Sequence, residues 1–470
     1  MKCNRFQTAF CRRDLLRTAA CGFGQIGLAA LANQSQASPI PASEGFQQLS
    51  HTVGGAKRVI FLFMWGGPSH VDTFDYKPLL KDFHGRTATA EALRGRQPPG
   101  GTILGSPFKF KQHGEGGIWI SELFPHLAKH ADQMCVLRSL HTDGSAHGEA
   151  LLTLHTGKSN LVRPSVGAWV SYGLGAESQN LPAFITISPP RGHGGVQNYG
   201  SGFLPAAHQA TAIGAAEIPV ANAKISNLSN PVLNQSTQRS QLELIQSLNR
   251  SHLRTASVDP GIEGLISSYE LAFRMQSEVP QIMGLDGETK ETLELYGIGT
   301  VPTDNFGRQC LLARKFAEQG VRYIQVSTDY TWDHHTKNNE LLPKECARVD
   351  QPITALLTDL DRRGMLEDTL VIWGSEFGRT PTAENQDGRN HHPAAFSMWM
   401  AGGGVKGGYT YGATDDLGFQ PVDKPMHMHD FHATLLHGLG LDHKRLTYRH
   451  AGRDFRLTDI FGNPATEIFS

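Results

Sequence analysis

Six short apolar runs alternate with longer helical patterns along this sequence. The first run, residues 58–65, is almost continuously apolar and ends at Gly66-Gly67, which is typical of a buried parallel strand. Strands that alternate with long helices favour an α/β fold with helices on both faces of the sheet. The other predicted strands are residues 134–140, 182–187, 321–327, 369–375 and 396–401, and the clearest helical patterns are residues 306–319 and 344–363.

The middle of the chain departs from this alternation. Residues 188–232 are rich in Gly, Ser, Asn and Ala, and helical patterns follow at residues 236–255 and 261–278. A chain of 470 residues is long enough for one large domain that carries an insertion. We therefore predict one domain over residues 57–470, with residues 188–300 as an insertion or cap.

The N-terminus reads as a targeting segment. Residues 11–32 combine Arg12 and Arg13 with a short apolar stretch rich in Gly and Ala, and this stretch is too short and too weakly apolar for a transmembrane helix. The pattern resembles a twin-arginine signal, which implies export of the folded protein by the twin-arginine export machinery. We predict a cleaved signal and leader over residues 1–37 and a linker over residues 38–56, with a periplasmic or secreted product.

Charge and cysteine content exclude several classes of protein. The formal net charge is -1, which does not suit a nucleic-acid-binding surface, and no apolar span of membrane length follows the leader. After the leader only Cys135, Cys310 and Cys346 remain, without a C-x-x-C pair, so we expect buried thiols and no disulfide framework. The 22 histidines, several of them beside Asp, suit a metal site.

Polar residues follow the first predicted strand at the point where it ends. Ligands of an open parallel sheet bind beyond the carboxyl ends of its strands. His70 and Asp72 would share one side of the chain if it stays extended, and could then bind a metal together. The alternative is that Asp72 caps the next helix.

Three further polar clusters lie next to predicted strands. Asp333 and His335 follow one strand, Glu376 and Arg379 follow the next, and His391 precedes the last. A carboxylate with an Arg three residues on suits a cation beside an oxyanion, although a surface ion pair would give the same pattern. Imidazole and carboxylate ligands predict a divalent metal, zinc before manganese or calcium.

At this point the sequence resembles the domain of unknown function 1501 family. The resemblance covers nearly the whole chain after the leader. It implies a secreted protein, often with a twin-arginine leader, in the alkaline phosphatase-like superfamily that also holds the sulfatases. The implied fold is an alkaline phosphatase-like three-layer sandwich with a mostly parallel central sheet and an inserted cap. The segments that carry it are G-G-P-S-H-V-D-T-F-D-Y-K-P, W-D-H-H-T-K-N-N, V-I-W-G-S-E-F-G-R-T-P, G-R-N-H-H-P, H-D-F-H-A-T-L-L-H-G-L-G-L-D and R-L-T-Y-R-H-A-G-R-D-F-R-L-T-D-I.

The resemblance also implies roles for residues of the first and later strands. Asp72 resembles the carboxylate ligand after the first strand, and Glu376 stands where the superfamily has the Asp of S-D-H-G. Phe377 replaces the His of that motif, so one cation site would lose an imidazole. Either His70 or His147 then supplies it, or only one metal binds.

A second cation site is implied by the other clusters. Asp333 and His335 resemble a D-x-x-x-H pair with compressed spacing. His391 resembles the late histidine that closes this site, and His392 is its close competitor.

The sequence leaves the identity of the nucleophile open. Formylglycine sulfatases carry C-x-P-x-R followed by a helix that ends in T-G, and counting back from Gly157 places His147 at the Cys position, which excludes formylglycine. Ser145, at a helix N-terminus, could act as a metal-activated nucleophile. His147 could instead be a ligand or form a phosphohistidine-like adduct, or water could attack, while Arg379 supports the developing charge.

These observations predict an exported, metal-dependent hydrolase of phosphate or sulfate esters, acting on a small-molecule or carbohydrate ester. The alternative from another class is a non-catalytic, secreted glycan-binding or surface-binding protein that keeps the fold. An isomerase resembling phosphoglycerate mutase is disfavoured by the export signal.

Overall fold

The computed structural model describes residues 55–88, 100–225, 232–253 and 260–470. The predicted signal and nearly all of the predicted linker lie outside these residues. Within the described ranges, no helix has the length and apolar character that a membrane crossing needs. The three remaining cysteines are free and buried, as expected.

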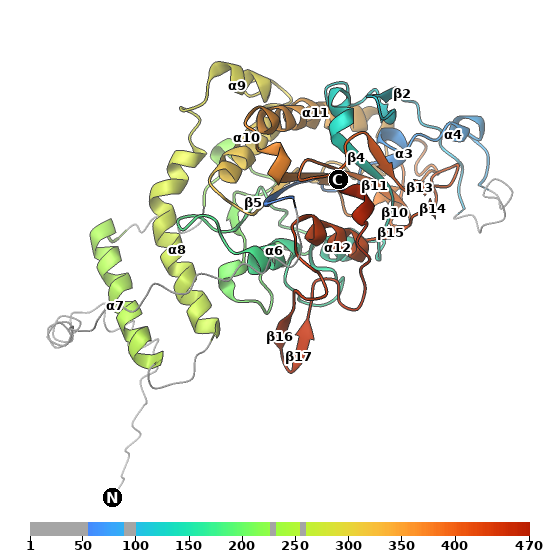
Figure 1. The fold of residues 1–470 in the computed structure, drawn as a ribbon. Coiled ribbons are helices and arrows are strands. Elements are labelled where there is room, and N and C mark those ends of the chain that lie inside the picture. The colour runs from blue at the N-terminus through green and yellow to red at the C-terminus, as the bar shows by residue number, and fades with distance from the viewer. Residues whose placement is uncertain (1–54, 89–99, 226–231, 254–259) are drawn as a thin grey trace, which may run out of the picture. The chain divides into compact units, whose positions relative to one another are not determined.

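A mostly parallel central sheet forms the middle layer (Figure 1). Its nine strands are β1 (Arg58–Phe63), β4 (Met134–His141), β5 (Phe184–Ile187), β6 (Thr211–Ile213), β7 (Tyr323–Ser327), β8 (Thr369–Gly374), β11 (Phe396–Ala401), β12 (Tyr409–Tyr411) and β15 (Met426–His427). They run in the order β12-β4-β11-β8-β1-β7-β5-β6, with β15 beside β4. Of these, β11 alone runs antiparallel to its neighbours, β4 and β8. All six predicted strands are present, and the predicted α/β class is confirmed.

Helices cover both faces of this sheet. The side chains of β1 alternate, so Phe61 and Phe63 pack into the buried cluster on one face of the sheet, whereas Ile60 and Leu62 pack into the cluster on the other face. Burying one such side chain contributes about 1.5–3 kcal/mol. The helices are α3 (His70–Thr73), α4 (Leu79–Asp82), α5 (His147–Thr156), α6 (Val166–Leu174), α7 (Gln235–Leu253), α8 (Pro260–Met283), α9 (Lys290–Leu295), α10 (Asp304–Glu318), α11 (Asn338–Arg362) and α12 (Met428–Gly438).

Short elements decorate the layers. Two-stranded pairs are formed by β2 (Phe110–His113) with β3 (Ile118–Ser121), β9 (Gly378–Arg379) with β10 (His391–His392), β13 (Ala413–Thr414) with β14 (Pro421–Asp423) and β16 (Tyr448–His450) with β17 (Arg453–Phe455). The 3₁₀ turns are η2 (Leu127–Gln133), η3 (Gly195–Tyr199), η4 (Ala206–His208), η5 (Val220–Asn222), η6 (Leu366–Asp368) and η7 (Thr466–Ile468). The β9–β10 pair is the one that shapes the site.

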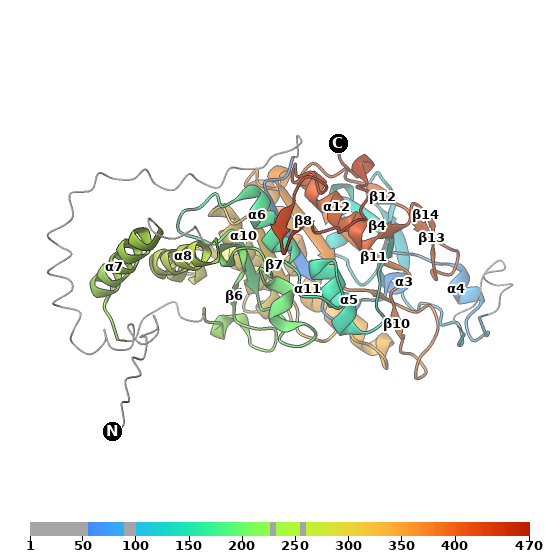
Figure 2. The same ribbon diagram turned by 90° about the horizontal axis from the view of Figure 1, so that it is seen from below.

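The segment predicted as an insertion, residues 188–300, is tied to the sheet at one edge. Its strand β6 pairs with β5, and Met275 and Val279 of α8 reach the main core. Figures 1 and 2 show α7 and α8 on this side, beyond β5 and β6.

The chain turns sharply after β1, and two glycines make the turn possible. Gly66 and Gly67 have φ values of 125° and 85°, which a side chain rarely adopts. A Cβ on Gly66 would lie 2.7 Å from the backbone nitrogen of Asp333. These glycines therefore let the loops after β7 and β8 close over the end of β1.

The expected extended chain after this turn is wrong. Residues His70–Thr73 form the single helical turn α3, with Ser69 at its N-cap position. Residues that are two positions apart on a helix point to different sides, so the side chains of His70 and Asp72 do not lie together as a pair of metal ligands.

Candidate metal centre

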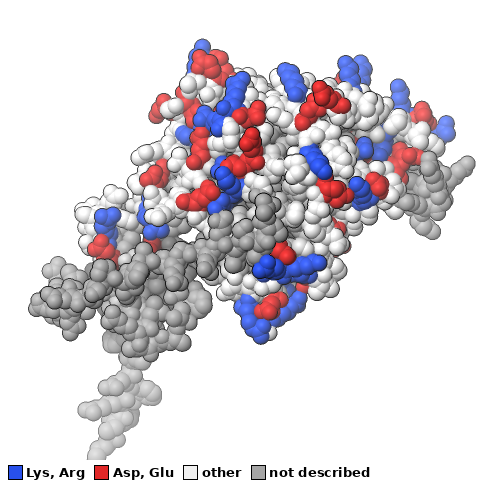
Figure 3. Space-filling model, viewed as in Figure 1, with Lys and Arg blue, Asp and Glu red and all other residues white. Residues whose placement is uncertain are grey.

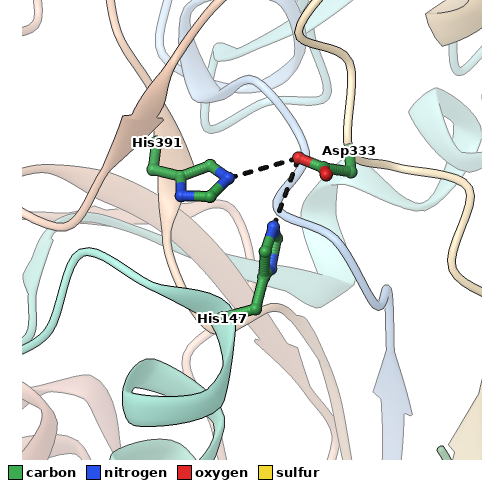
Figure 4. A group of neighbouring side chains, drawn as sticks. All are labelled: His147, Asp333 and His391. Carbon is green, nitrogen blue, oxygen red and sulfur yellow. Dashed lines mark hydrogen bonds and ion pairs between the residues drawn. The ribbon is translucent and has the colours of Figure 1, made fainter. Parts of the chain in front are cut away.

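Three imidazoles and one carboxylate converge at the carboxyl end of the sheet. His147 begins α5, Asp333 and His335 follow β7, and His391 belongs to β10. The Nε2 atoms of His147, His335 and His391 lie 3.2, 3.0 and 3.3 Å from the same oxygen, Oδ1 of Asp333. Figure 4 shows His147 and His391 directed at this carboxylate from two different elements, α5 and β10. One ligand atom each from His147, Asp333 and His391 lies within 4.8 Å of the others, which could hold a metal ion.

Nδ1 of each imidazole lies next to a hydrogen-bond acceptor. Carboxylates and backbone carbonyls accept hydrogen bonds and cannot donate them, so Nδ1 of each ring must be the donor. A neutral ring that donates from Nδ1 carries a lone pair on Nε2. The acceptors are Oε1 of Glu376 at 2.6 Å for His147, Oε2 of Glu384 at 2.5 Å for His335 and the Ser145 carbonyl at 2.7 Å for His391.

The arrangement of these atoms suits a shared cation. The Nε2 atoms of His335 and His391 are 2.9 Å apart, and two lone pairs at this distance repel. A tetrahedral zinc with bonds of 2.0–2.1 Å separates its ligands by about 3.3 Å. The three Nε2 distances to Oδ1 of Asp333 and the His335–His391 distance, 2.9–3.3 Å, are close to that edge, and donation from Nδ1 to an outer partner is usual for histidines that bind metal.

The electrostatics of the cluster favour a positive charge. Burial raises the pKa of Asp333, but its polar contacts with the Nε2 atoms of His147 and His391, with Arg379 nearby, outweigh burial and hold the pKa well below its usual range. Burial lowers the pKa of His147, yet its hydrogen bonds to Asp333 and Glu376 raise it overall. The centre therefore keeps an ionised carboxylate and attracts either a proton or a metal ion.

The β9–β10 pair selects one of two adjacent histidines. Because side chains alternate along a strand, His391 faces the cluster and His392 faces away. His392 is buried, donates from Nε2 to the Phe419 carbonyl at 2.9 Å, and stacks on His70. Of these two competing candidates, the structure brings His391 to the centre.

Glu376 lies behind His147 and not at the point where the Nε2 atoms meet. Its carboxylate is fully buried, and Oε1 also accepts the Gly66 N–H at 3.1 Å. Its other oxygen, Oε2, accepts the Ser375 hydroxyl at 2.5 Å. This contact favours a role for Glu376 in orienting His147 over the direct ligand role predicted for it.

Replacing Glu376 with glutamine tests this role. The amide oxygen can still accept the bond from His147, but the negative charge that strengthens the imidazole as a ligand is lost. We expect zinc affinity to fall about 10-fold to 100-fold, the usual effect of an outer-shell partner. Titration calorimetry of chelator-treated protein measures it, with Glu340→Gln on the exposed face of α11 as the matched control. An unchanged zinc affinity for Glu376→Gln would contradict the assignment.

The Arg379 side chain holds the loops of the site together. Its side chain is 1% exposed, and it donates from Nε to the Gly67 carbonyl at 2.9 Å and from Nη1 to the Arg389 carbonyl at 3.1 Å. Its Nη2 donates to the Gly66 carbonyl and to Asp333. The predicted contact of Arg379 with a developing charge on substrate is corrected accordingly, because the guanidinium ties the loops together and orients Asp333.

His70 and Asp72 lie outside the centre. Asp72 is fully buried and forms an ion pair with Arg389 at 2.7 Å, with further hydrogen bonds from Ser69 and Asn338. His70 is buried, with Nε2 3.0 Å from the Gly418 carbonyl. The structure does not bring this pair to the centre, since α3 turns both side chains into the protein interior.

Ser145 touches the centre through its backbone alone. The residue is exposed, and α5 begins two positions later with Ala146 as its N-cap. In the described part of the chain, no hydrogen bond to the Ser145 hydroxyl is formed, while its carbonyl holds His391.

Several neighbours of the cluster carry no sequence signal that would identify them. Glu384 follows Glu376 in an irregular loop, and only the fold brings it to His335. The Tyr330 hydroxyl donates to Oδ2 of Asp333 at 2.7 Å. His193, in the Gly-rich loop after β5, stacks on His147 with ring centroids 5.2 Å apart.

The chain matches a protein-family model over nearly all of its described residues. A family model described as "Protein of unknown function (DUF1501)" matches residues 56–469. The chain belongs to the DUF1501 family. The resemblance predicted from the sequence motifs is confirmed, and no curated protein matches the sequence.

Solved structures similar to this DUF1501 protein include sulfatases and phosphatases. PsFucS1 sulfatase from Pseudoalteromonas sp. is 14% identical, with 82% of this chain and 68% of that chain covered and a TM-score of 0.35. Phosphonate monoester hydrolase SpPMH from Silicibacter pomeroyi is 10% identical, with coverage of 82% and 73% and a TM-score of 0.32. Alkaline phosphatase from the Antarctic bacterium TAB5 is 9% identical, with coverage of 76% and 94% and a TM-score of 0.30.

Proposed function

We propose that this DUF1501 protein hydrolyses phosphate or sulfate esters with a divalent cation held by His147, Asp333, His335 and His391. The observation that carries the proposal is the convergence of three Nε2 atoms on one carboxylate oxygen. Three imidazoles and one carboxylate favour zinc over manganese or calcium.

A divalent cation at this centre would polarise the ester oxygens and lower the pKa of a nearby water. Glu376 and Glu384 keep two imidazoles in their ligand tautomer, and Tyr330 orients Asp333. The side chains of Asp333 and His335 are 20% and 33% exposed, so an ester can approach from this side. His147 replaces the formylglycine precursor, which leaves water or the exposed Ser145 hydroxyl as the attacking group.

The place of action belongs to the same proposal. The paired arginines and the short apolar stretch of the leader support export by the twin-arginine route to the periplasm or the exterior. That route carries folded protein, which is compatible with metal loading before export.

Removal of the metal tests the proposal. We expect chelator-treated protein to lose turnover of aryl phosphate and aryl sulfate esters by about a thousandfold, since the cation supplies several kcal/mol of stabilisation. Zinc should restore the activity at one equivalent per chain. Full turnover by protein that metal analysis shows to be free of divalent cations would refute the mechanism.

One observation favours the non-catalytic alternative. The buried Arg379 is unavailable to an ester, so this fold could bind a glycan or a surface without turning it over. A panel of phosphorylated and sulfated sugars separates the two functions, because a binding protein retains zinc but releases no phosphate or sulfate from any member.

A further inference from the structure

Positive charge gathers on one surface away from the metal centre. Two segments form it, residues 156–164 and residues 442–461, which include the β16–β17 hairpin. Together they hold seven Lys and Arg residues and three Asp residues, whereas the whole chain has a formal net charge of -1. Figure 3 shows blue side chains over the hairpin. Local segregation of this kind indicates an anionic partner.

The two segments are packed against each other. Nζ of Lys158 lies 3.3 Å from Oδ2 of Asp459, and the Arg163 guanidinium lies 4.3 Å from the centre of the Phe455 ring. Arg453 covers the same ring at 4.8 Å. The side chains of Lys158, Arg163 and Arg456 line a small pocket between the segments, with Asp459 as its one acidic side chain.

Arg163 is the unusual member of this group. Within the described residues its guanidinium contacts aromatic rings but forms no hydrogen bond and no ion pair. Burial lowers its pKa despite the nearby Asp459. Its N–H donors remain available to a phosphate, which a guanidinium binds through two parallel hydrogen bonds.

Exposed apolar side chains flank the same pocket. Leu161 and Val162 precede Arg163 and are 49% and 64% exposed. Ile460 and Phe461 follow Asp459 and are 73% and 52% exposed. Apolar tips beside cations are typical of proteins that rest on anionic lipid, where the tips enter the interface and the cations meet headgroups.

A sulfated glycan would use this surface less well. The aromatic rings here stack on each other, as Phe203 does on His450 at 4.9 Å and 12°, so their faces are occupied. Exposed aliphatic side chains have no favourable role against a polyanionic sugar. The combination of charge and apolar exposure favours lipid.

We propose that residues 156–164 and 442–461 dock this protein on an anionic lipid bilayer, with lipid phosphates meeting Arg163 and the exposed side chains of Arg449 and Arg453. The surface is linked to the metal centre by α5, which has His147 at its first residue and Thr156 at its last. A helix of ten residues spans about 15 Å, so docking would hold the centre close to the membrane surface.

Co-sedimentation of the full chain with lipid vesicles tests the docking. We expect binding to vesicles of about three parts phosphatidylcholine to one part phosphatidylglycerol, and little binding to phosphatidylcholine alone. Arg449→Gln with Arg453→Gln should weaken binding about 25-fold, since each cation near the surface contributes about 5-fold. Ile460→Ser should weaken it further, and salt should weaken the charge-dependent part.

The matched control removes two exposed cations elsewhere. Lys290→Gln with Lys344→Gln, on α9 and α11, should bind vesicles like the unchanged protein. All variants should keep their melting temperature and zinc content. The proposal is overturned if the full chain stays in solution, if both double variants lose binding equally, or if the hairpin variant loses binding to a sulfated polysaccharide but not to vesicles.

Discussion

Replacing His391 with alanine is expected to abolish zinc binding and ester hydrolysis while the protein remains folded. The imidazole is one of the four proposed ligands, and its side chain is 17% exposed, so little packing is lost. Removing a ligand should lower zinc affinity by more than the 100-fold upper limit for an outer-shell partner. Turnover should fall by about a thousandfold if the cation supplies several kcal/mol. Titration calorimetry and metal analysis measure the first effect independently of any substrate.

The neighbouring His392 provides the control. Burial and the adjacent His70 lower its pKa to about 3, so it is a neutral core residue. His392→Ala should therefore destabilise the fold by about 2–4 kcal/mol and leave zinc affinity unchanged in the folded protein. A reversed result, with zinc lost in His392→Ala and kept in His391→Ala, would exclude the proposed centre.

Much of the fold can be predicted from the sequence because its central strands are buried on both faces. Such strands leave continuous apolar runs, and the runs at residues 58–65 and 369–375 match β1 and β8 to within two residues. The edge strands β6, β12 and β15 are two or three residues long and leave no such run. Pairing with the existing sheet, and not their own composition, makes them strands.

The site is predicted in part for a similar reason. Loops that follow parallel strands meet at one edge, and this places Asp333 and His335 near the loop that carries His391. The order of strands in the sheet decides which loops are neighbours, and the sequence does not reveal this order. His147 arrives from α5 as one of two alternatives for an imidazole, and only the backbone of α3 shows why His70 cannot take its place.

The distinction between a ligand and its support lies beyond sequence patterns. Glu376 is close to the centre, but a carboxylate that faces a metal and one that faces an imidazole have the same sequence signature. The difference is set by the backbone at Gly66, whose positive φ permits its N–H to approach the Glu376 carboxylate. The sequence likewise suggests that Arg379 contacts substrate, whereas in the structure its guanidinium donates to backbone carbonyls.

The second large effect is expected at Asp72, whose role is structural. Asp72→Asn should lower the free energy of unfolding by about 3–5 kcal/mol, because it leaves the Arg389 guanidinium buried without its counter-charge. Both side chains are fully buried, and the asparagine amide would point a donor at Arg389 or Ser69. Chemical denaturation followed by circular dichroism measures the loss.

The pH dependence gives the sign of this contribution. Burial raises the pKa of Asp72, but the charge and hydrogen bonds of Arg389 outweigh burial and lower it overall. A carboxyl whose pKa is lower in the folded state stabilises the protein above its unfolded pKa of about 3.9. That stability is lost as the pH falls through the folded pKa, so the gap between the unchanged protein and Asp72→Asn should be constant near neutrality and narrow below about pH 4.

Two further variants separate the pair from its surroundings. Glu340→Gln breaks an ion pair whose side chains are 57% and 60% exposed, and should cost less than about 1 kcal/mol. Asp72→Leu with Arg389→Met removes both charges and should recover part of the stability lost in Asp72→Asn, since no unpaired charge remains. If Asp72→Asn costs no more than Glu340→Gln, the structural role of Asp72 is contradicted. If zinc affinity falls while stability is unchanged, Asp72 acts as a metal ligand instead.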